Sequence, residues 1–217
     1  MSEIKAILFD LDGTLLDTLS DLAGSMNSVL SRLNLPTHPQ EAYRYFVGDG
    51  METLARRVLP EESRTPAMIA HCAEAMRGEY LHHWAVRTKL YAGIPELLDS
   101  LTGRGLPLTI LSNKPEAFTR MMVNHFLSAW PWRLVRGARP DCPNKPDPSG
   151  AMAIAAALDL APGQFLYLGD TNTDMRTAGS CGMYPVGALW GFRTRAELEE
   201  SGAKLLLQHP LEMLQVL

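Results

Sequence analysis

The stretch Lys5-Ala6-Ile7-Leu8-Phe9-Asp10-Leu11-Asp12-Gly13-Thr14 decides the fold of this chain. Its unbroken apolar run, residues 6–9, is typical of a strand that is buried on both faces of a parallel sheet. Asp10 and Asp12 follow at once, and open parallel sheets bind ligands just beyond the carboxyl ends of their strands. Asp and Gly are also common in turns, so a simple loop is the alternative. The stretch favours a functional site at the end of the first strand.

The composition limits the classes of protein to which the chain can belong. Its 217 residues suffice for one large domain, or for one domain that carries a smaller insert. Hydrophobic residues make up 46% and charged residues 20%, which is typical of a soluble globular protein. The formal net charge of −4 argues against a sequence-independent nucleic-acid binder, because such a protein needs a basic face. We therefore expect no nucleic-acid partner.

The sequence also predicts the compartment. No apolar run approaches the roughly 20 residues of a membrane span, and the N-terminus lacks the pattern of a signal peptide. Cys72, Cys142 and Cys181 are far apart and have no zinc-binding spacing, which indicates reduced thiols. We expect a cytoplasmic protein, a monomer or a homodimer, that does not bind membranes.

Helical periodicity follows the first strand and continues over residues 16–88, where we expect no strand. Beyond this segment strands alternate with helices, which predicts a parallel sheet with right-handed crossovers. The expected strands there are 106–111, 133–136, 165–168 and 184–189, with a further short apolar run at 205–207. We predict an α/β protein: a Rossmann-like parallel sheet core with helices on both faces, built from residues 1–15 and 89–217. Residues 16–88 form an all-helical cap over the strand ends, with hinges near 15–17 and 86–89.

Polar residues recur at the ends of the predicted strands. Asp10 and Asp12 follow the first strand, Ser112 and Asn113 the second, and Asp170 and Asp174 a later one, while Lys145 lies in a loop before a helix. In a parallel sheet these strand-end groups converge on one crevice. Paired Asp oxygens without His or Cys favour Mg²⁺, the usual partner of phosphate oxygens. Lys145 supplies positive charge, and Ser112 and Thr14 supply hydroxyl groups, so the set suits phosphoryl transfer.

Four motifs, in this order and spacing, resemble those of the haloacid dehalogenase superfamily. They are Asp10-Leu11-Asp12-Gly13-Thr14, Ser112-Asn113-Lys114, Lys145-Pro146-Asp147-Pro148, and Gly169-Asp170 with Asp174. The resemblance covers essentially the whole chain, and the predicted helical insert resembles the C1-type cap of that family. The segments 91–98 and 190–194 are similar to its phosphoglycolate-phosphatase-like branch.

The resemblance implies a role for each matching residue. Asp10 would be the nucleophile that forms an aspartyl-phosphate, and Asp12 would protonate the leaving alcohol and then activate water. Mg²⁺ would be held by Asp10, Asp170 and the backbone carbonyl of Asp12, with Asp174 binding it directly or through water. The expected phosphate-binding residues are Thr14, Ser112, Asn113 and Lys145. For Asn113 a turn residue, and for Asp174 an acid at a helix N-terminus, are the alternatives.

These roles imply an Mg²⁺-dependent phosphatase for a small phosphorylated metabolite, with phosphoglycolate as the leading substrate. Asp12 favours phosphoryl transfer over carbon–halogen cleavage, which needs no proton donor to an alcohol. The segment between Lys5 and Lys89 contains no lysine, which disfavours the phosphonate-cleaving relatives that form a Schiff base. A sugar-phosphate mutase of the same superfamily, similar to beta-phosphoglucomutase, is the alternative enzyme. A non-catalytic phospho-ligand-binding protein is a further alternative, disfavoured by the intact acidic residues and Lys145.

The helical insert is expected to contribute to substrate choice. Gly48-Asp49-Gly50 is the insert loop expected to reach the crevice, because glycine permits a close approach of the backbone. Arg44 or Arg56, with Arg57 as a further candidate, would then clamp a substrate carboxylate through two hydrogen bonds.

Overall fold

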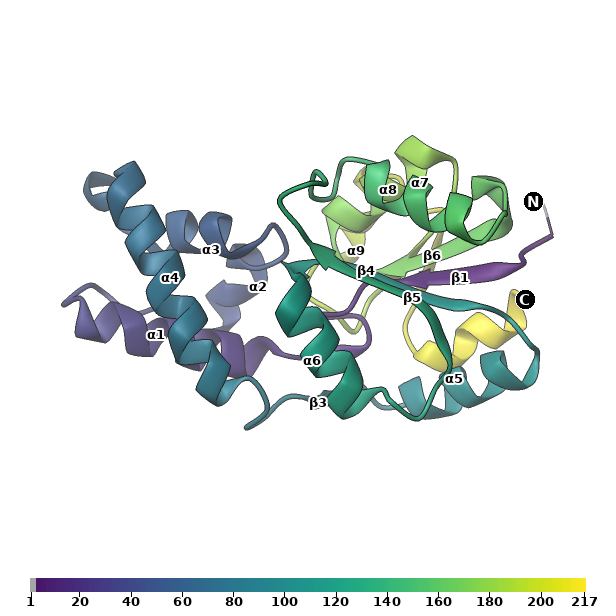
Figure 1. Ribbon diagram of the computed structural model, residues 1–217, viewed down its shortest axis with the longest axis horizontal. Coiled ribbons are helices and arrows are strands. Elements are labelled where there is room, and N and C mark those ends of the chain that lie inside the picture. Colours follow the sequence, from purple (N-terminus) through teal and green to yellow (C-terminus); the bar gives the residue numbers. More distant parts are fainter. Residues whose placement is uncertain (1–2) are drawn as a thin grey trace.

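A six-stranded parallel sheet lies at the centre of the larger part of the molecule (Figure 1). The computed structural model describes residues 3–217. The strand order is β5-β4-β1-β6-β7-β8, and every neighbouring pair in it is parallel. The arrangement confirms the predicted α/β fold class. The strands are β1 Ala6–Phe9, β4 Leu108–Pro115, β5 Trp132–Ala138, β6 Phe165–Gly169, β7 Tyr184–Ala188 and β8 Leu205–Leu207.

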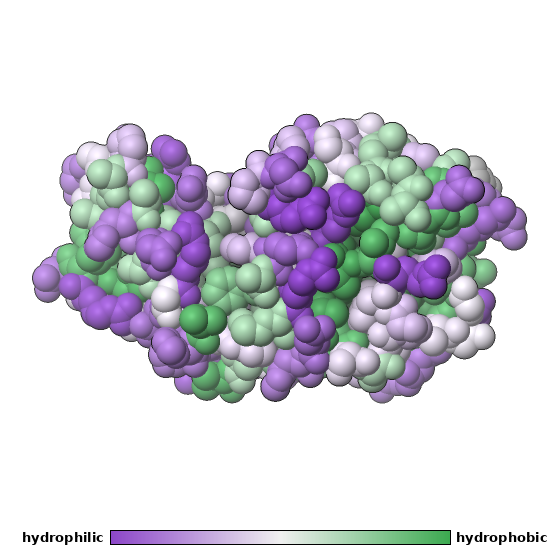
Figure 2. Space-filling view, viewed as in Figure 1, coloured by the Kyte–Doolittle hydropathy of each residue, from purple (hydrophilic) through white to green (hydrophobic). Residues whose placement is uncertain are grey.

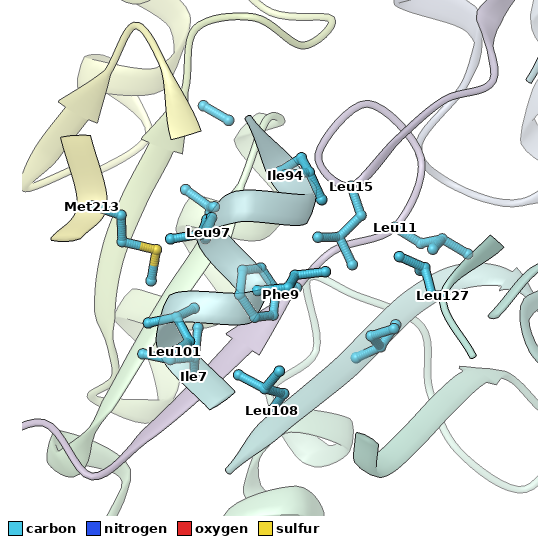
Figure 3. Packing of buried hydrophobic residues seen from close by; sticks show 14 of the residues in the cluster. Ile7, Phe9, Leu11, Leu15, Ile94, Leu97, Leu101, Leu108, Leu127 and Met213 are labelled. Carbon is cyan, nitrogen blue, oxygen red and sulfur yellow. The ribbon is translucent and has the colours of Figure 1, made fainter. Parts of the chain in front are cut away.

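The first strand lies at the centre of the sheet, between β4 and β6, with all four residues fully buried. Successive side chains of a strand point to opposite faces, and β1 follows this rule. Ile7 and Phe9 pack into the hydrophobic cluster on one face, shown in Figure 3, and Ala6 and Leu8 join the cluster on the other. A strand with both faces buried explains the unbroken apolar run in the sequence.

Helices cover both faces of this sheet. Helices α5 and α6 and the 3₁₀ helix η4 contribute to the cluster around Phe9, whereas α7 and α8 contribute to the cluster around Leu8 (Figure 1). Within residues 3–217, none of the helices combines the length and apolar character that crossing a membrane requires. The elements are α5 Ile94–Gly103, α6 Glu116–Phe126, α7 Ser149–Ala157, the short turn η3 Pro162–Gln164, α8 Asn172–Cys181, α9 Arg195–Glu200 and η4 Pro210–Gln215.

Residues 19–83, which lie between the first strand and α5, form four helices and two short 3₁₀ turns, here called the helical segment. They enclose a hydrophobic cluster of their own, which Phe118 and Phe192 join from outside the segment. In the space-filling view a notch in the upper outline marks where the helical segment meets the part of the molecule that contains the six-stranded sheet, here called the sheet-bearing part (Figure 2). The elements are α1 Leu19–Arg32, η1 Gln40–Ala42, α2 Tyr43–Phe46, α3 Met51–Val58, η2 Glu61–Ser63 and α4 Pro66–His83.

The expectation that residues 16–88 contain no strand is wrong at the start of that range. β2, Leu16–Asp17, pairs antiparallel with β3, Lys89–Leu90. The chain enters and leaves the helical segment side by side, so the backbone groups of the two linkers satisfy each other. The Asp21 carboxylate strengthens this junction, because it accepts hydrogen bonds from the backbone N–H groups of Arg87 and Thr88 and from the Thr88 hydroxyl. The domain boundaries and the hinges stay proposals.

Strand β4 is longer than the sequence predicts, because it runs on past residue 111 to Pro115. After an irregularity in register, Pro115 pairs with Ala138 of β5. The Ser112-Asn113-Lys114 motif is therefore held in extended backbone at the end of a central strand.

Candidate active site

Three buried carboxylates converge beyond the ends of β1 and β6. Asp10 follows β1, Asp170 follows β6, and Asp174 lies in the first turn of α8. One carboxylate oxygen from each lies within 4.8 Å of the other two. The parallel sheet thus brings together residues that are 160 positions apart in the sequence. All of the oxygens are hard donors, so the cluster is suited to a hard divalent cation.

Lys145 is the cation in contact with this cluster. Its Nζ atom lies 2.8 Å from Oδ1 of Asp10, 2.7 Å from Oδ1 of Asp174 and 2.9 Å from the carbonyl oxygen of Leu111. Burial would lower the pKa of the ammonium, but the carboxylates of Asp10 and Asp174 raise it well above its ordinary value. These three contacts use every ammonium hydrogen and fix Lys145 beside Asp10.

One lysine does not balance three buried carboxylates. Burial and the neighbouring Asp174 raise the pKa of Asp10 well above its ordinary value. The same two causes raise the pKa of Asp170 to about 7, against hydrogen bonds from Phe192 and Thr14 that lower it. The excess of negative charge is the condition under which a bound dication stabilises a site most.

Asp170 is held in a fixed orientation. The Thr14 hydroxyl donates to Oδ1 at 2.8 Å, and the backbone N–H of Phe192 donates to Oδ2 at 2.8 Å. Gly13 has φ +88°, and a Cβ atom there would lie 2.2 Å from Oδ2 of Asp170, so only glycine fits. Thr14, which the sequence places among the phosphate-binding residues, is fully buried and is engaged with Asp170.

Asp174 lies both at the acidic cluster and at a helix N-terminus, the two alternatives that the sequence leaves open for it. Its Oδ2 atom accepts hydrogen bonds from the backbone and hydroxyl of Thr171, as part of a capping box at the start of α8. Its Oδ1 atom accepts from Lys145 and from the Tyr167 hydroxyl. The Asp174 carboxylate is therefore both a helix N-terminal acid and a member of the buried cluster.

Ser112 and Asn113 lie at the edge of the same site. The Ser112 Oγ atom accepts a hydrogen bond from the backbone N–H of Lys114 at 3.1 Å. The Asn113 side chain accepts from the backbone N–H of Lys145 and donates to the carbonyl oxygens of Lys145 and Gly48. Asn113 thus joins the end of β4 to the Lys145 loop and to the helical segment.

Sequence reasoning missed a contact of Lys114 with Asp12. The Lys114 Nζ atom lies 3.0 and 3.1 Å from the two carboxylate oxygens of Asp12, and 3.1 Å from the hydroxyl of Tyr80 in α4. Lys114 lies two positions after Ser112 in extended backbone, and such residues face the same side of a strand. That alternation is the sequence signal that could have placed Lys114 at the site.

A cavity lies between the strand ends and the helical segment. The strand ends contribute the polar part of its lining, with Asp10 and Asp12 among the residues, and the helical segment contributes mainly apolar side chains. Gly48 and Gly50 both line it, and the positive φ of Gly50, +90°, suits a glycine at this approach. The full lining is Asp10, Asp12, Leu22, Val47, Gly48, Gly50, Met51, Leu54, Ser112, Asn113, Lys114 and Pro115.

The arginines proposed from the sequence do not line this cavity. Arg44 donates to the carbonyl oxygen of Gly191 at 2.7 Å, Arg56 is exposed on α3, and Arg57 pairs with Asp49. Arg193, which the sequence did not single out, is buried and donates to the carbonyl oxygens of Arg44 and Val47. Arg44 and Arg193 therefore hold the helical segment against the sheet-bearing part.

Known proteins are similar to this chain in sequence. The sequence profile of the haloacid dehalogenase-like hydrolase family matches residues 7–188. The phosphoglycolate phosphatase of Aquifex aeolicus is 30% identical over 87% of this chain and 86% of its own length. That of Mannheimia succiniciproducens is 28% identical over 99% of both chains.

A solved structure shows the same fold. It comes from Haemophilus somnus 129PT and is described as a predicted phosphoglycolate phosphatase. It superposes with a TM-score of 0.91, at 26% identity, over 100% of this chain and 99% of its own. The chain therefore belongs to the haloacid dehalogenase-like hydrolase family, where it groups with the phosphatases of the phosphoglycolate-phosphatase-like branch.

Proposed function

We propose that the protein is an Mg²⁺-dependent phosphatase that hydrolyses a small phosphomonoester through an aspartyl-phosphate on Asp10. The observation that carries the proposal is the position of the Asp10 carboxylate. It lines the cavity, Lys145 holds one of its oxygens, and two further buried carboxylates lie beside it. A carboxylate fixed at a cavity wall by a lysine is oriented for attack on a phosphorus atom.

Two steps complete the reaction. In the first, an oxygen of Asp10 attacks phosphorus, the bond from phosphorus to the ester oxygen breaks, and Asp12 gives its proton to the leaving alcohol. In the second, Asp12 takes a proton from water, the water oxygen attacks phosphorus, and inorganic phosphate leaves Asp10. The Ser112 hydroxyl donates to a phosphoryl oxygen, and the positive charge of Lys145, whose hydrogens are already engaged, stabilises the negative charge of the phosphoryl group through space.

The residues of the acidic cluster fit Mg²⁺. Asp10, Asp170 and the backbone carbonyl of Asp12 would hold the ion, which supplies positive charge to the phosphoryl group when bound. Asp174 would act through water, because its carboxylate already accepts hydrogen bonds from Lys145, Tyr167 and Thr171. The excess of buried negative charge supports this assignment.

Phosphoglycolate is the first substrate to test, because the curated relatives carry that name. The protein is incubated with a panel of phosphomonoesters, with Mg²⁺ or with a chelator, and released phosphate is measured. We expect Mg²⁺-dependent release by the wild type and none by Asp10→Asn. Activity that survives in Asp10→Asn would refute the assignment of Asp10 as the nucleophile. An isomerised sugar phosphate as the product would favour the sugar-phosphate mutase.

A further inference from the structure

We propose that Lys114 and Tyr80 are positioning residues for Asp12, so that proton transfer depends on the docking of helix α4. The inference rests on the proposed function, because it concerns the residue to which the proton transfer is assigned. Nothing in the four family motifs points to Tyr80, which lies in α4 of the helical segment and contacts Lys114 through its hydroxyl group.

The first step of the argument is the pairing of Asp12. Its side chain is 17% exposed and lies at the cavity. Among residues 3–217, the Asp12 carboxylate accepts hydrogen bonds from Lys114 alone, and both oxygens lie within 3.1 Å of Nζ. A carboxylate with one neighbour takes its orientation from that neighbour, so Lys114 sets the direction in which Asp12 presents its oxygens.

The second step is the confinement of Lys114. Its side chain is 2% exposed, and its ammonium group contacts both oxygens of Asp12 and the hydroxyl oxygen of Tyr80. The same Nζ atom lies 4.6 Å from the centre of the Tyr80 ring. The three donors of the ammonium group are thus in use. Binding of a substrate anion by Lys114 would require one of these bonds to break.

The third step is the anchoring of Tyr80. The residue is fully buried, and its ring packs on Phe118 of α6 with ring centres 5.3 Å apart. Burial raises the pKa of Tyr80 to about 12, so the phenol keeps its proton and offers its oxygen to Lys114 as an acceptor. The Tyr80 hydroxyl donates to the sulfur of Met122, and its oxygen lies 3.9 Å from that sulfur. The contact between α4 and α6 therefore fixes the acceptor that holds Lys114.

These contacts form one path from the helical segment to the proposed acid. If α4 moved away from α6, Lys114 would lose the Tyr80 oxygen and Asp12 would lose a fixed partner. A substrate that allows the helical segment to dock would, through the same contacts, orient Asp12, the residue that protonates the leaving alcohol of that substrate.

The test compares two phosphate esters that differ in their need for a proton. Nitrophenolate leaves phosphorus without protonation, whereas propanol requires a proton, so only propyl phosphate depends strongly on the acid. The variants are Tyr80→Phe, which keeps the ring, and Lys114→Met, which keeps the stem. kcat/KM is measured for both esters, because it reports only the steps up to release of the alcohol.

We expect Tyr80→Phe to lower kcat/KM for propyl phosphate about tenfold, the effect of one lost hydrogen bond to a charged group. The value for p-nitrophenyl phosphate should change little, and Lys114→Met should enlarge the difference. Tyr43→Phe is the matched control. It is the same change in the same segment, but the Tyr43 hydroxyl donates to Asn27, whereas the Tyr80 hydroxyl contacts Lys114.

Equal losses for both esters would overturn the proposal, because they would indicate a general structural role. Unchanged values for both esters, or a loss in Tyr43→Phe equal to that in Tyr80→Phe, would overturn it as well. Wild-type protein that releases no phosphate from these two esters or from any member of the phosphomonoester panel would refute the proposed function instead, as would full activity in Asp10→Asn. Thermal unfolding of each variant checks that Lys114→Met still folds, and Tyr80→Phe carries the test if it does not.

Discussion

The Nζ atom of Lys145 lies 2.8 Å from Oδ1 of Asp10, and both side chains are buried at the carboxyl edge of the sheet. Lys145 is the charge that allows Asp10 and Asp174 to coexist in the interior. Removal of one member of a buried ion pair leaves an uncompensated charge, which costs more than the pair itself contributes.

Replacement of Lys145 by Met should therefore lower stability as well as activity. We expect metal-free Lys145→Met to lose about 3–5 kcal/mol of unfolding free energy, as for other broken buried ion pairs. Urea denaturation in a chelator measures the loss. Lys5→Met is the control, because its side chain is 46% exposed, and it should stay within about 0.5 kcal/mol of the wild type. Equal stability of the two variants would contradict the structural role of Lys145.

The acidic cluster should make metal-free stability depend on pH. The pKa of Asp170 is about 7 in the folded protein, above the ordinary value of 3.8, because of burial and Asp174. The native state then binds more protons than the unfolded state between these values. The stability that the raised pKa of Asp170 contributes is therefore greatest below pH 4, and it is lost as the pH rises through 7.

Mg²⁺ competes with these protons, so it should raise Tm more at pH 8 than at pH 5. Thermal unfolding with and without Mg²⁺ across this range gives the comparison. Asp170→Asn should lose most of the Mg²⁺ effect and should flatten the pH dependence of the metal-free protein. A larger Mg²⁺ effect at pH 5 than at pH 8 would refute the assignment of the ion to this cluster.

The fold and much of the site could be predicted because strand ends carry a strong local signal. Residues 6–9 are apolar without a break, and the parallel sheet brings Asp10 and Asp170 to one edge. The start of helix α4 is also encoded by neighbouring residues, because the Thr65 side chain caps the helix and Pro66 is its first residue. These features depend on neighbours in the sequence and on one rule of topology.

The partners of individual side chains could not be predicted in the same way. Thr14 bonds to Asp170 across 156 positions, and Arg193 bonds to Arg44 across 149. A hydroxyl beside a carboxylate motif suits a phosphate and a second carboxylate equally well, so the sequence does not choose between them. The choice depends on packing around Gly13, which brings Asp170 within reach of the Thr14 hydroxyl.

Thr14→Val separates these two roles. Valine keeps the shape of threonine but removes the donor to Asp170, and loss of such an orienting group typically costs 10–100-fold in metal affinity. We expect the Mg²⁺ concentration for half-maximal activity to rise by about that factor, with KM for the ester unchanged at saturating Mg²⁺. Thr109→Val, which loses a buried bond to the Ile7 carbonyl, is the control. A rise in KM alone would support the phosphate contact predicted from the sequence.

The arginines of the helical segment give the last prediction. The Arg44 guanidinium donates to the Gly191 carbonyl, and Arg56 is exposed, so neither is available at the cavity wall. Arg56→Ala should leave KM for phosphoglycolate unchanged. Arg44→Ala should lower unfolding free energy by about 0.5–1.5 kcal/mol, the contribution of one hydrogen bond. Steady-state kinetics and urea denaturation measure these effects. If an arginine clamped the substrate carboxylate, its removal would raise KM about tenfold or more, because a charge-assisted pair would be lost.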